Sequence, residues 1–323
     1  MEKKDLRIVY MGTPEFAVES LRRLVEDGYN VVGVITMPDK PMGRHGSVLQ
    51  PSPVKQYATA QGLKVLQPEK LKDESFVEEL RSLHADLQIV VAFRMLPEVV
   101  WDMPRLGTFN LHASLLPQYR GAAPINWAVI NGETETGITT FFLKHEIDTG
   151  EIIDQVRVPI ADTDNVGIVY DKLMMLGGDL VLKTVDTILT GHIKTTPQET
   201  LAEGTELHPA PKIFKETCRI DWTKETKRIY DFIRGLSPYP GAWTELHEDR
   251  KQPVTMKVFE AEKVSGTPSA APGTIETDGK TDFRIASADG YIKVISLQLA
   301  GKKRMHINDF LKGYRHIDGT YVK

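Results

Sequence analysis

The sequence contains a single cysteine, Cys218, among 323 residues. One cysteine excludes an internal disulfide and any metal site built from several cysteines, and it is typical of proteins in a reducing compartment. The sequence also lacks any run of about 20 apolar residues, which excludes a membrane-spanning helix. Its first 12 residues carry charges without an apolar run, so we expect neither a signal peptide nor a transit peptide and expect a cytoplasmic protein.

An overall surplus of positive charge is lacking as well, because 40 Lys+Arg face 44 Asp+Glu and the net charge is −4. The balance is nevertheless uneven along the chain: residues 1–208 carry −9 and residues 209–323 carry +5. Such asymmetry is typical of proteins in which one part meets a polyanion. By itself, a surplus of this size is equally compatible with ordinary solvated surface.

The first 190 residues alternate between short β-branched runs and segments of helical periodicity. The expected strands are 7–12, 31–37, 64–68, 87–93, 108–117, 137–143 and 151–160. The expected helices are 14–28, with Thr13 as N-cap, then 53–61, 73–83, 123–131 and 166–190. This alternation predicts an α/β domain with a parallel sheet that helices cover on both faces.

The pattern changes after residue 190. Residues 191–211 are polar and contain several Gly and Pro, and we interpret them as a linker. A helix over 224–236 is then followed by short β-rich pieces separated by turns, which predicts a small β-barrel. We therefore expect an α/β domain over 1–190, a linker over 191–211 and a second domain over 212–323.

The first strand ends in Met11-Gly12-Thr13-Pro14, which is not a nucleotide-binding turn. The dinucleotide fingerprint G-x-G-x-x-G lets the backbone approach a pyrophosphate and the helix pack closely, both of which Pro14 and Phe16 would obstruct here. No P-loop sequence occurs either. We interpret Gly12 as the residue of a tight strand-to-helix turn.

Polar residues occupy alternate positions in the expected strand 108–117. Asn110, His112 and Ser114 would share one face and would lie near the carboxyl end, where open α/β sheets bind ligands. Burying each of them unpaired would cost about 1–3 kcal/mol, so their presence indicates a function. The alternative is that they are turn-forming or internally satisfied structural groups.

Asp148 follows the next strand, in the sequence Ile147-Asp148-Thr149-Gly150. A right-handed connection would bring it near His112, although an aspartate before Thr-Gly is also a common turn residue. The sequence has no G-x-S-x-G nucleophile motif and no metal-ligand spacing such as H-E-x-x-H. Asn, His and Asp together suit direct attack of an amine on a carbonyl. Asn can donate to the oxyanion, His can donate to it or move a proton, and Asp can orient and charge the His.

Residues 110–127, NLHASLLPQYRGAAPINW, and the later IDTG at 147–150 resemble the 10-formyltetrahydrofolate-dependent formyltransferases. The resemblance extends over nearly the whole chain. It includes MGTPEFAV at 11–18, MPDKPMGR at 37–44, PSPVK at 51–55, SPYPGAW at 237–243 and LQLAGKKRM at 297–305. It implies a Rossmann-like formyltransferase domain followed by an OB-like β-barrel.

The resemblance also implies the reaction: the formyl group of 10-formyltetrahydrofolate moves to the amino group of methionyl initiator tRNA, without a covalent enzyme intermediate or a metal. The matching catalytic residues are Asn110, His112 and Asp148. The matching folate-binding residues are Ser114, Leu115, Leu116 and Pro117. The residues expected to contact tRNA are Arg44, Lys302, Lys303 and Arg304. We expect the protein to act as a monomer.

Two positions depart from the family pattern. Residues 45–47 read His-Gly-Ser where many relatives carry lysines, which leaves less charge for phosphate in the loop over 38–50. Phe93-Arg94 replaces the usual Tyr-Gly, and because arginine cannot adopt every glycine conformation, we expect a different local backbone at the folate pocket.

Two other functions remain open at this point. One is a formyltransferase that acts on an amino-sugar nucleotide, since such enzymes can carry a similar second domain. The other is a non-catalytic RNA-binding module that kept the fold, against which the intact Asn110, His112 and Asp148 argue. A formylation assay with both kinds of acceptor distinguishes the three.

Overall fold

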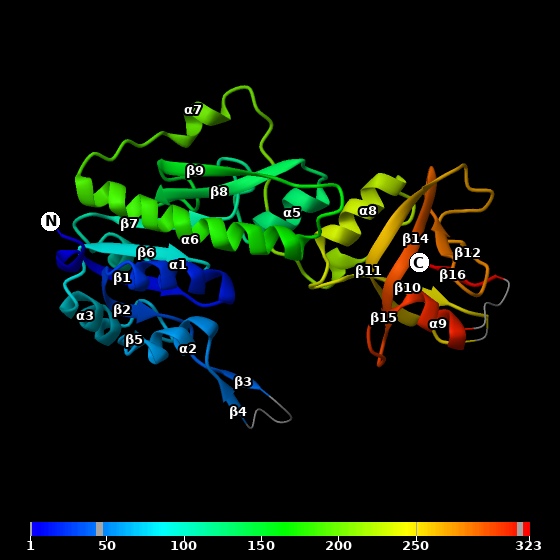
Figure 1. Ribbon diagram of the computed structural model, residues 1–323, viewed down its shortest axis with the longest axis horizontal. Coiled ribbons are helices and arrows are strands. Elements are labelled where there is room, and N and C mark those ends of the chain that lie inside the picture. The colour runs from blue at the N-terminus through cyan, green and yellow to red at the C-terminus, as the bar shows by residue number, and fades with distance from the viewer. Residues whose placement is uncertain (1, 43–47, 250, 315–318) are drawn as a thin grey trace. The chain divides into compact units, whose positions relative to one another are not determined.

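The structure, a computed structural model, describes residues 2–42, 48–249, 251–314 and 319–323. The chain forms two compact units that do not follow the chain order (Figure 1). The first unit consists of Met1–Gly121, Gly137–Val158 and Tyr170–Pro209. The second unit consists of Ala122–Thr136, Pro159–Val169 and Ala210–Lys323.

A seven-stranded sheet forms the centre of the first unit, in the order β5-β2-β1-β6-β7-β8-β9. Its strands are β1 (Arg7–Gly12), β2 (Asn30–Ile35), β5 (Val65–Leu66), β6 (Leu87–Val91), β7 (Thr108–His112), β8 (Glu135–Phe142) and β9 (Ile152–Pro159). The pairs from β5 to β7 are parallel, as the alternation of strands and helices predicts. The pair β7–β8 is antiparallel, so the expectation of a right-handed parallel crossover between them was wrong.

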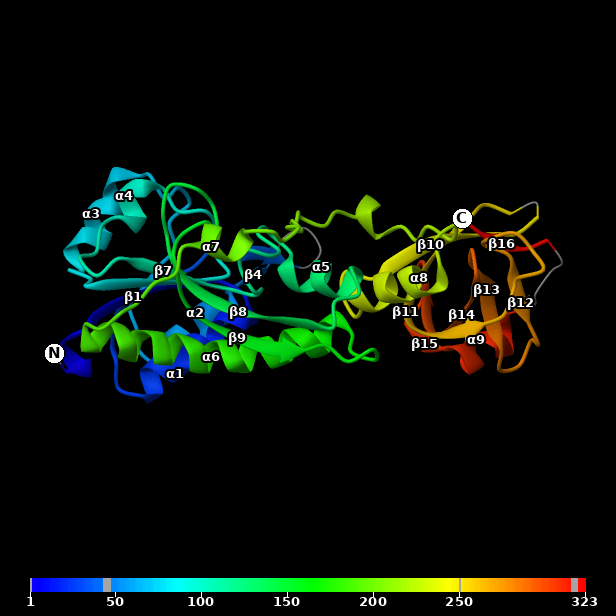
Figure 2. The ribbon, with the colours of Figure 1, turned by 90° about the horizontal axis from the view of Figure 1, so that it is seen from above.

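Helices cover both faces of this sheet, which confirms the expected α/β architecture (Figure 2). One face carries α1 (Glu15–Glu26) and α6 (Val166–Thr190); the other carries α3 (Glu74–Ser82) and α4 (Glu98–Trp101). Thr140 of β8 bonds Thr184 of α6 at 2.9 Å. On the opposite face, residues of β1, β2 and β6 form one buried cluster with α3. No helix in the described part of the chain is long and apolar enough to cross a membrane.

The turn between β1 and α1 leaves no room for a side chain at Gly12. A Cβ there would lie 2.6 Å from the Cβ of Ala17 and 2.9 Å from the carbonyl oxygen of Val91. The expected N-cap role of Thr13 was wrong: Pro14 precedes the helix, and the Thr13 hydroxyl instead accepts a hydrogen bond from the Met37 amide at 3.3 Å. The hydroxyl therefore joins this turn to the end of β2.

The loop over 38–50 contains a two-stranded antiparallel ribbon. Its strands are β3 (Lys40–Met42) and β4 (Val48–Gln50). The side chains of Val48 and Leu49 are exposed. Arg44, the residue expected to contact tRNA in this loop, lies outside the described residues.

Antiparallel strands of the second unit form a nearly closed barrel, which confirms the expected small barrel domain. These strands are β10 (Ala242–His247), β11 (Val254–Ser265), β12 (Ile275–Thr277), β13 (Phe283–Ala286), β14 (Gly290–Leu299), β15 (Met305–His306) and β16 (Tyr321–Val322). The sheet runs β12-β13-β14-β11-β10-β16, and β15 pairs with β14. A bridge between Thr274 and Tyr321 joins the two ends of this order.

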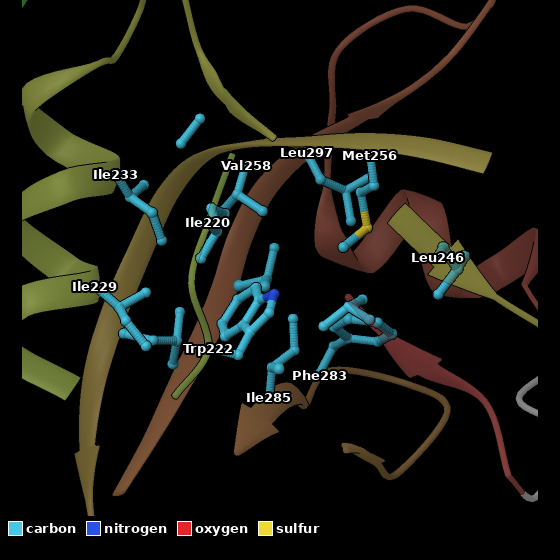
Figure 3. Packing of buried hydrophobic residues seen from close by; sticks show 14 of the residues in the cluster. Ile220, Trp222, Ile229, Ile233, Leu246, Met256, Val258, Phe283, Ile285 and Leu297 are labelled. Carbon is cyan, nitrogen blue, oxygen red and sulfur yellow. The ribbon is translucent and has the colours of Figure 1, made fainter. Parts of the chain in front are cut away.

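The barrel interior is filled by side chains from its strands and from two helices, α8 (Thr226–Gly235) and α9 (Ile307–Gly313) (Figure 3). Trp222 lies in this cluster and donates its indole N–H to the Thr244 hydroxyl at 3.0 Å. The short helix α5 (Pro124–Ile130) also belongs to the second unit. The Asn126 amide of α5 donates to the Gly235 carbonyl of α8 at 2.9 Å.

Candidate active site

The carboxyl half of β7 presents the first two candidate catalytic residues. Asn110 is partly exposed, and its side-chain amide has no hydrogen-bond partner among the described residues. His112, two residues further along the strand, is 7% exposed, and its ring lies edge-on to that of Phe141. The structure therefore leaves the Asn110 amide available to a substrate and encloses the imidazole beside it.

The tautomer of His112 follows from its hydrogen bond. The ring nitrogen Nε2 lies 2.9 Å from the carbonyl oxygen of Tyr119. Because a carbonyl only accepts hydrogen bonds, Nε2 carries the proton. In the neutral ring Nδ1 is then the unprotonated nitrogen, and it is the one that can exchange a proton.

Asp148 lies in the connection between β8 and β9, and its carboxylate Oδ2 accepts a hydrogen bond from the Gly121 amide at 3.2 Å. The hydrogen bonds of the described residues do not pair this carboxylate with His112 directly. Instead the segment 119–121 touches both residues, through the Tyr119 carbonyl and the Gly121 amide. The structure thus brings Asp148 and His112 to opposite ends of one three-residue segment.

The backbone around these residues is in an uncommon conformation. Ala92, directly after β6, has φ +47°, Tyr119 has φ +56° and Asp148 has φ +54°. A left-handed conformation at a residue other than glycine costs on the order of 1–3 kcal/mol and persists only where surrounding contacts fix it. Such residues are concentrated at active sites and ligand clamps, so this grouping supports the placement of the site.

The candidate folate segment Ser114–Pro117 lies beyond the end of the strand. β7 ends at His112, so the expectation that Ser114 shares a strand face with Asn110 and His112 was wrong. The reason is that the chain turns: the buried Ser114 hydroxyl donates to the Gln118 carbonyl at 2.6 Å. Of the side chains of Ser114, Leu115, Leu116 and Pro117, only that of Leu115 is not buried.

Two further residues hold this region, and sequence analysis assigned neither of them a role. Gln198 is fully buried in α7 (Gln198–Ala202), within the stretch interpreted as a linker. Its side chain bonds Arg120 and also the carbonyls of Asp148 and Gly150. The surrounding sequence is polar and has no period, so no pattern distinguishes this glutamine. Arg120 stands inside the NLHASLLPQYRG motif but matched none of the residues expected to be catalytic.

Arg94, the departure from the family pattern, points its guanidinium at backbone carbonyls. Nη1 donates to the Glu69 carbonyl at 2.7 Å, Nη2 donates to that of Pro68, and burial lowers the pKa of the group. The left-handed residue of this loop is Ala92, not Arg94. An arginine is therefore compatible with the backbone where relatives have glycine.

The candidate basic residues of the second unit lie in the exposed turn between β14 and β15. Arg304 pairs with Glu260, donates to the Ser296 hydroxyl at 2.9 Å and lies over the Phe259 ring at 4.6 Å. The ammonium groups of Lys302 and Lys303 have no partner among the described residues. The two lysines are therefore freer than the arginine to meet an anion.

Cys218 lies in the second unit and is buried, with its thiol against the Phe214 carbonyl at 3.3 Å. Burial raises the pKa of this thiol. Within the described ranges no three His, Cys, Asp or Glu residues come together as a metal site would require.

Comparison with known proteins agrees with both units. Residues 6–185 match the family model described as formyl transferase, and residues 212–315 match the model of the formyl transferase C-terminal domain. A methionyl-tRNA formyltransferase of Phocaeicola vulgatus is 76% identical over 324 residues, covering 100% of both chains. One of Bacteroides fragilis is 70% identical over 323 residues, covering 100% of this chain and 99% of the relative.

Among solved structures, the fold is similar to that of WlaRD, a sugar 3N-formyl transferase crystallised in the presence of dTDP and 5-N-formyl-THF. The TM-score is 0.64 at 20% sequence identity, over 92% of this chain and 99% of that chain. At this identity the likeness concerns the fold alone. It extends beyond the α/β unit to most of the molecule.

Proposed function

The chain belongs to the formyl transferase family, and from this premise we propose that it formylates the amino group of methionyl initiator tRNA. Enzymes of this family use 10-formyltetrahydrofolate as the formyl donor. The observation that carries the proposal is the 76% identity, along the full chain, to a methionyl-tRNA formyltransferase. The surplus of positive charge in residues 209–323 supports a polyanionic acceptor.

The proposed reaction is a direct transfer. The amine nitrogen of the methionyl group attacks the formyl carbon, the bond from that carbon to N10 of the folate breaks, and a proton passes from the amine to N10. The free amide of Asn110 donates to the oxyanion that forms during the attack, and His112, when protonated, donates to it from Nδ1. No nucleophilic side chain is needed, in agreement with the position of Cys218 in the other unit.

Asp148 has the proposed role of moving the proton. Its Oδ2 is occupied by the Gly121 amide, and Oδ1 has no hydrogen bond among the described residues, so that oxygen is available to the attacking amine. The Tyr119 carbonyl, not Asp148, orients the His112 ring in the absence of substrates. This arrangement separates orientation of the imidazole from proton transfer.

The remaining assignments are also proposals. Ser114, Leu115, Leu116 and Pro117 would shape the folate pocket, with Leu115 offering the one accessible side chain of the four. Arg44, Lys302, Lys303 and Arg304 would meet the tRNA backbone. We also propose a catalytic domain over 1–190, a linker over 191–211 and a tRNA-binding domain over 212–323. A monomer in the cytoplasm, where charged tRNA is made, would meet both substrates.

The test is a formylation assay with 10-formyltetrahydrofolate and two acceptors, methionyl initiator tRNA and an amino-sugar nucleotide. We expect formyl-methionyl-tRNA and no formylated sugar. Activity only on the sugar would replace the proposed acceptor. Activity on neither acceptor, with tRNA binding retained, would favour a non-catalytic RNA-binding module.

A further inference from the structure

The side chain of Gln198 is fully buried, and its amide group uses its donors and its acceptor. The oxygen Oε1 accepts from Arg120 Nη2 at 2.7 Å and from Arg120 Nε at 3.1 Å. The nitrogen Nε2 donates to the carbonyls of Asp148 and Gly150, at 2.8 Å each. Carbonyls only accept and a guanidinium only donates, so the amide fits in one orientation.

These bonds fix the backbone that carries the Asp148 carboxylate. The Asp148 carbonyl takes a second donor, Arg120 Nε at 3.1 Å, so two side chains hold one peptide group. That support balances the left-handed conformation of Asp148, which is unfavourable for a residue with a Cβ. Gly150 is confined as well, because a Cβ there would lie 1.5 Å from the Phe142 carbonyl oxygen.

The chain that follows Gln198 holds the other side of the site. The His208 carbonyl accepts from the Tyr119 amide at 2.7 Å, and the two rings stack with centroids 5.9 Å apart. Gln118 bonds the His208 amide at 2.9 Å and the Glu206 carbonyl at 2.7 Å. Residues 198–208 therefore contact both the loop of Asp148 and the residue whose carbonyl orients His112.

We propose that Gln198 is a positioning residue for formyl transfer, which sets the direction of the Asp148 carboxylate from helix α7 of the first unit. The proposal rests on the proposed function, since it assumes that Asp148 moves the proton. Because its side chain is fully buried, Gln198 would touch neither substrate. Its effect falls on the rate of the chemical step and not on substrate binding.

The first variant is Gln198→Glu, which keeps the size of the side chain and its partner Arg120. It places a carboxylate oxygen against two carbonyls in place of two N–H donors, so the Asp148 loop is pushed from its position. We expect kcat to fall about 10- to 100-fold, because small displacements of a catalytic group have effects of that size. The KM values for folate and tRNA should stay within about twofold, as expected when only transition-state interactions are lost.

The matched control is Gln61→Glu, which makes the same chemical change at the exposed end of α2 (Pro53–Ala60) in the same unit. Its kcat should equal that of the unaltered enzyme. A similar fall of kcat in the control would assign the effect to added negative charge and would overturn the proposal.

The decisive measurement repeats Gln198→Glu in an Asp148→Asn enzyme. If Gln198 acts through Asp148, the further loss of kcat should shrink to less than about threefold, because the two changes remove one function. An equal fold-loss in both backgrounds would mean a general structural role and would overturn the proposal. An Asp148→Asn enzyme with full activity would instead refute the role of Asp148 in the proposed function, and the two failures are therefore distinguishable.

A second variant covers the case in which Gln198→Glu does not fold. Gln198→Met keeps a similar length, adds no charge and removes the donors to Asp148 and Gly150. We expect a folded enzyme, shown by a cooperative thermal transition, with the same kcat defect and the same dependence on Asp148. Unchanged kcat in a folded Gln198→Met enzyme would overturn the proposal.

Discussion

The candidate catalytic residues and the basic turn of the barrel are built in opposite ways. His112 and Asp148 are held by backbone groups, and their neighbourhood includes left-handed residues that need such support. Lys302 and Lys303 stand exposed in a turn, with no partner for their ammonium groups among the described residues. Bond formation requires groups fixed to within a fraction of an ångström, whereas attraction of a polyanion acts over about 8–10 Å and tolerates motion.

Asn110→Ala should have the largest effect. Removal of one oxyanion donor lowers kcat about 100- to 1,000-fold. The thermal unfolding midpoint should not change, because the Asn110 amide has no partner to lose among the described residues. Steady-state kinetics and a melting curve measure the two quantities. A kcat within threefold of the unaltered enzyme would contradict the role of Asn110.

The double variant Lys302→Glu, Lys303→Glu changes the basic turn of the barrel and should affect tRNA binding. We expect the KM for tRNA to rise about 10-fold at low salt and its salt dependence to become shallower, since each lost phosphate contact lowers the slope. The kcat at saturating tRNA should be unchanged. A reduced kcat with an unchanged KM would show that the turn takes part in the chemistry.

Arg304→Gln tests whether Arg304, whose guanidinium has partners within the barrel, contributes less to tRNA binding than Lys302 and Lys303. Because Arg304 already pairs with Glu260 and stacks on Phe259, we expect the KM for tRNA to rise less than in the lysine variant. The free energy of unfolding should fall by about 0.5–1 kcal/mol with the loss of the ring contact. Urea unfolding measures the change in stability, and steady-state kinetics measure the KM for tRNA. A larger rise of KM than in the double lysine variant would show that Arg304 is the main tRNA contact of this turn.

Cys218 should show the smallest effect. Its pKa is raised by burial, so the reactive thiolate is rarer at pH 8 than in an exposed cysteine, and alkylation should be slow until the pH exceeds that higher pKa. Cys218→Ala should keep full kcat. Rapid stoichiometric labelling of the folded enzyme by iodoacetamide, with loss of activity, would contradict this expectation.

Periodicity in the sequence was sufficient for the main elements of both units. Strand β6 and helix α6 stand out because long apolar or helical patterns leave few alternatives. The sequence did not indicate α9, whose seven residues are too short for a clear period, or the closing strand β16, which has only two residues. Ser114 was misplaced because alternation of polar residues continued past the end of the strand.

Part of the candidate site could also be predicted from clear patterns in the sequence. Asn110 and His112 are polar residues in an apolar strand, which distinguishes them from their neighbours. Asp148 was a candidate from its position after the next strand, and the family resemblance supported it. Gln198 was not predicted as a site residue, because its neighbours in the sequence are polar and its hydrogen-bond partners lie far away along the chain. Hydrogen bonds that join residues 50 and 78 positions apart leave no trace in local composition.

The placement of α5 in the second unit has a consequence for synthesis of the protein. Asn126 and Gly235, which the structure joins by a hydrogen bond, are 109 residues apart. At about 5–20 residues per second, a ribosome produces α8 roughly 5 to 20 s after α5. During that interval the apolar side of α5 with Ile130 and Trp127, which belong to one cluster with Ile229 and Ile233 of α8, lacks this partner in the nascent chain, and a chaperone that binds near the ribosomal exit would meet it there.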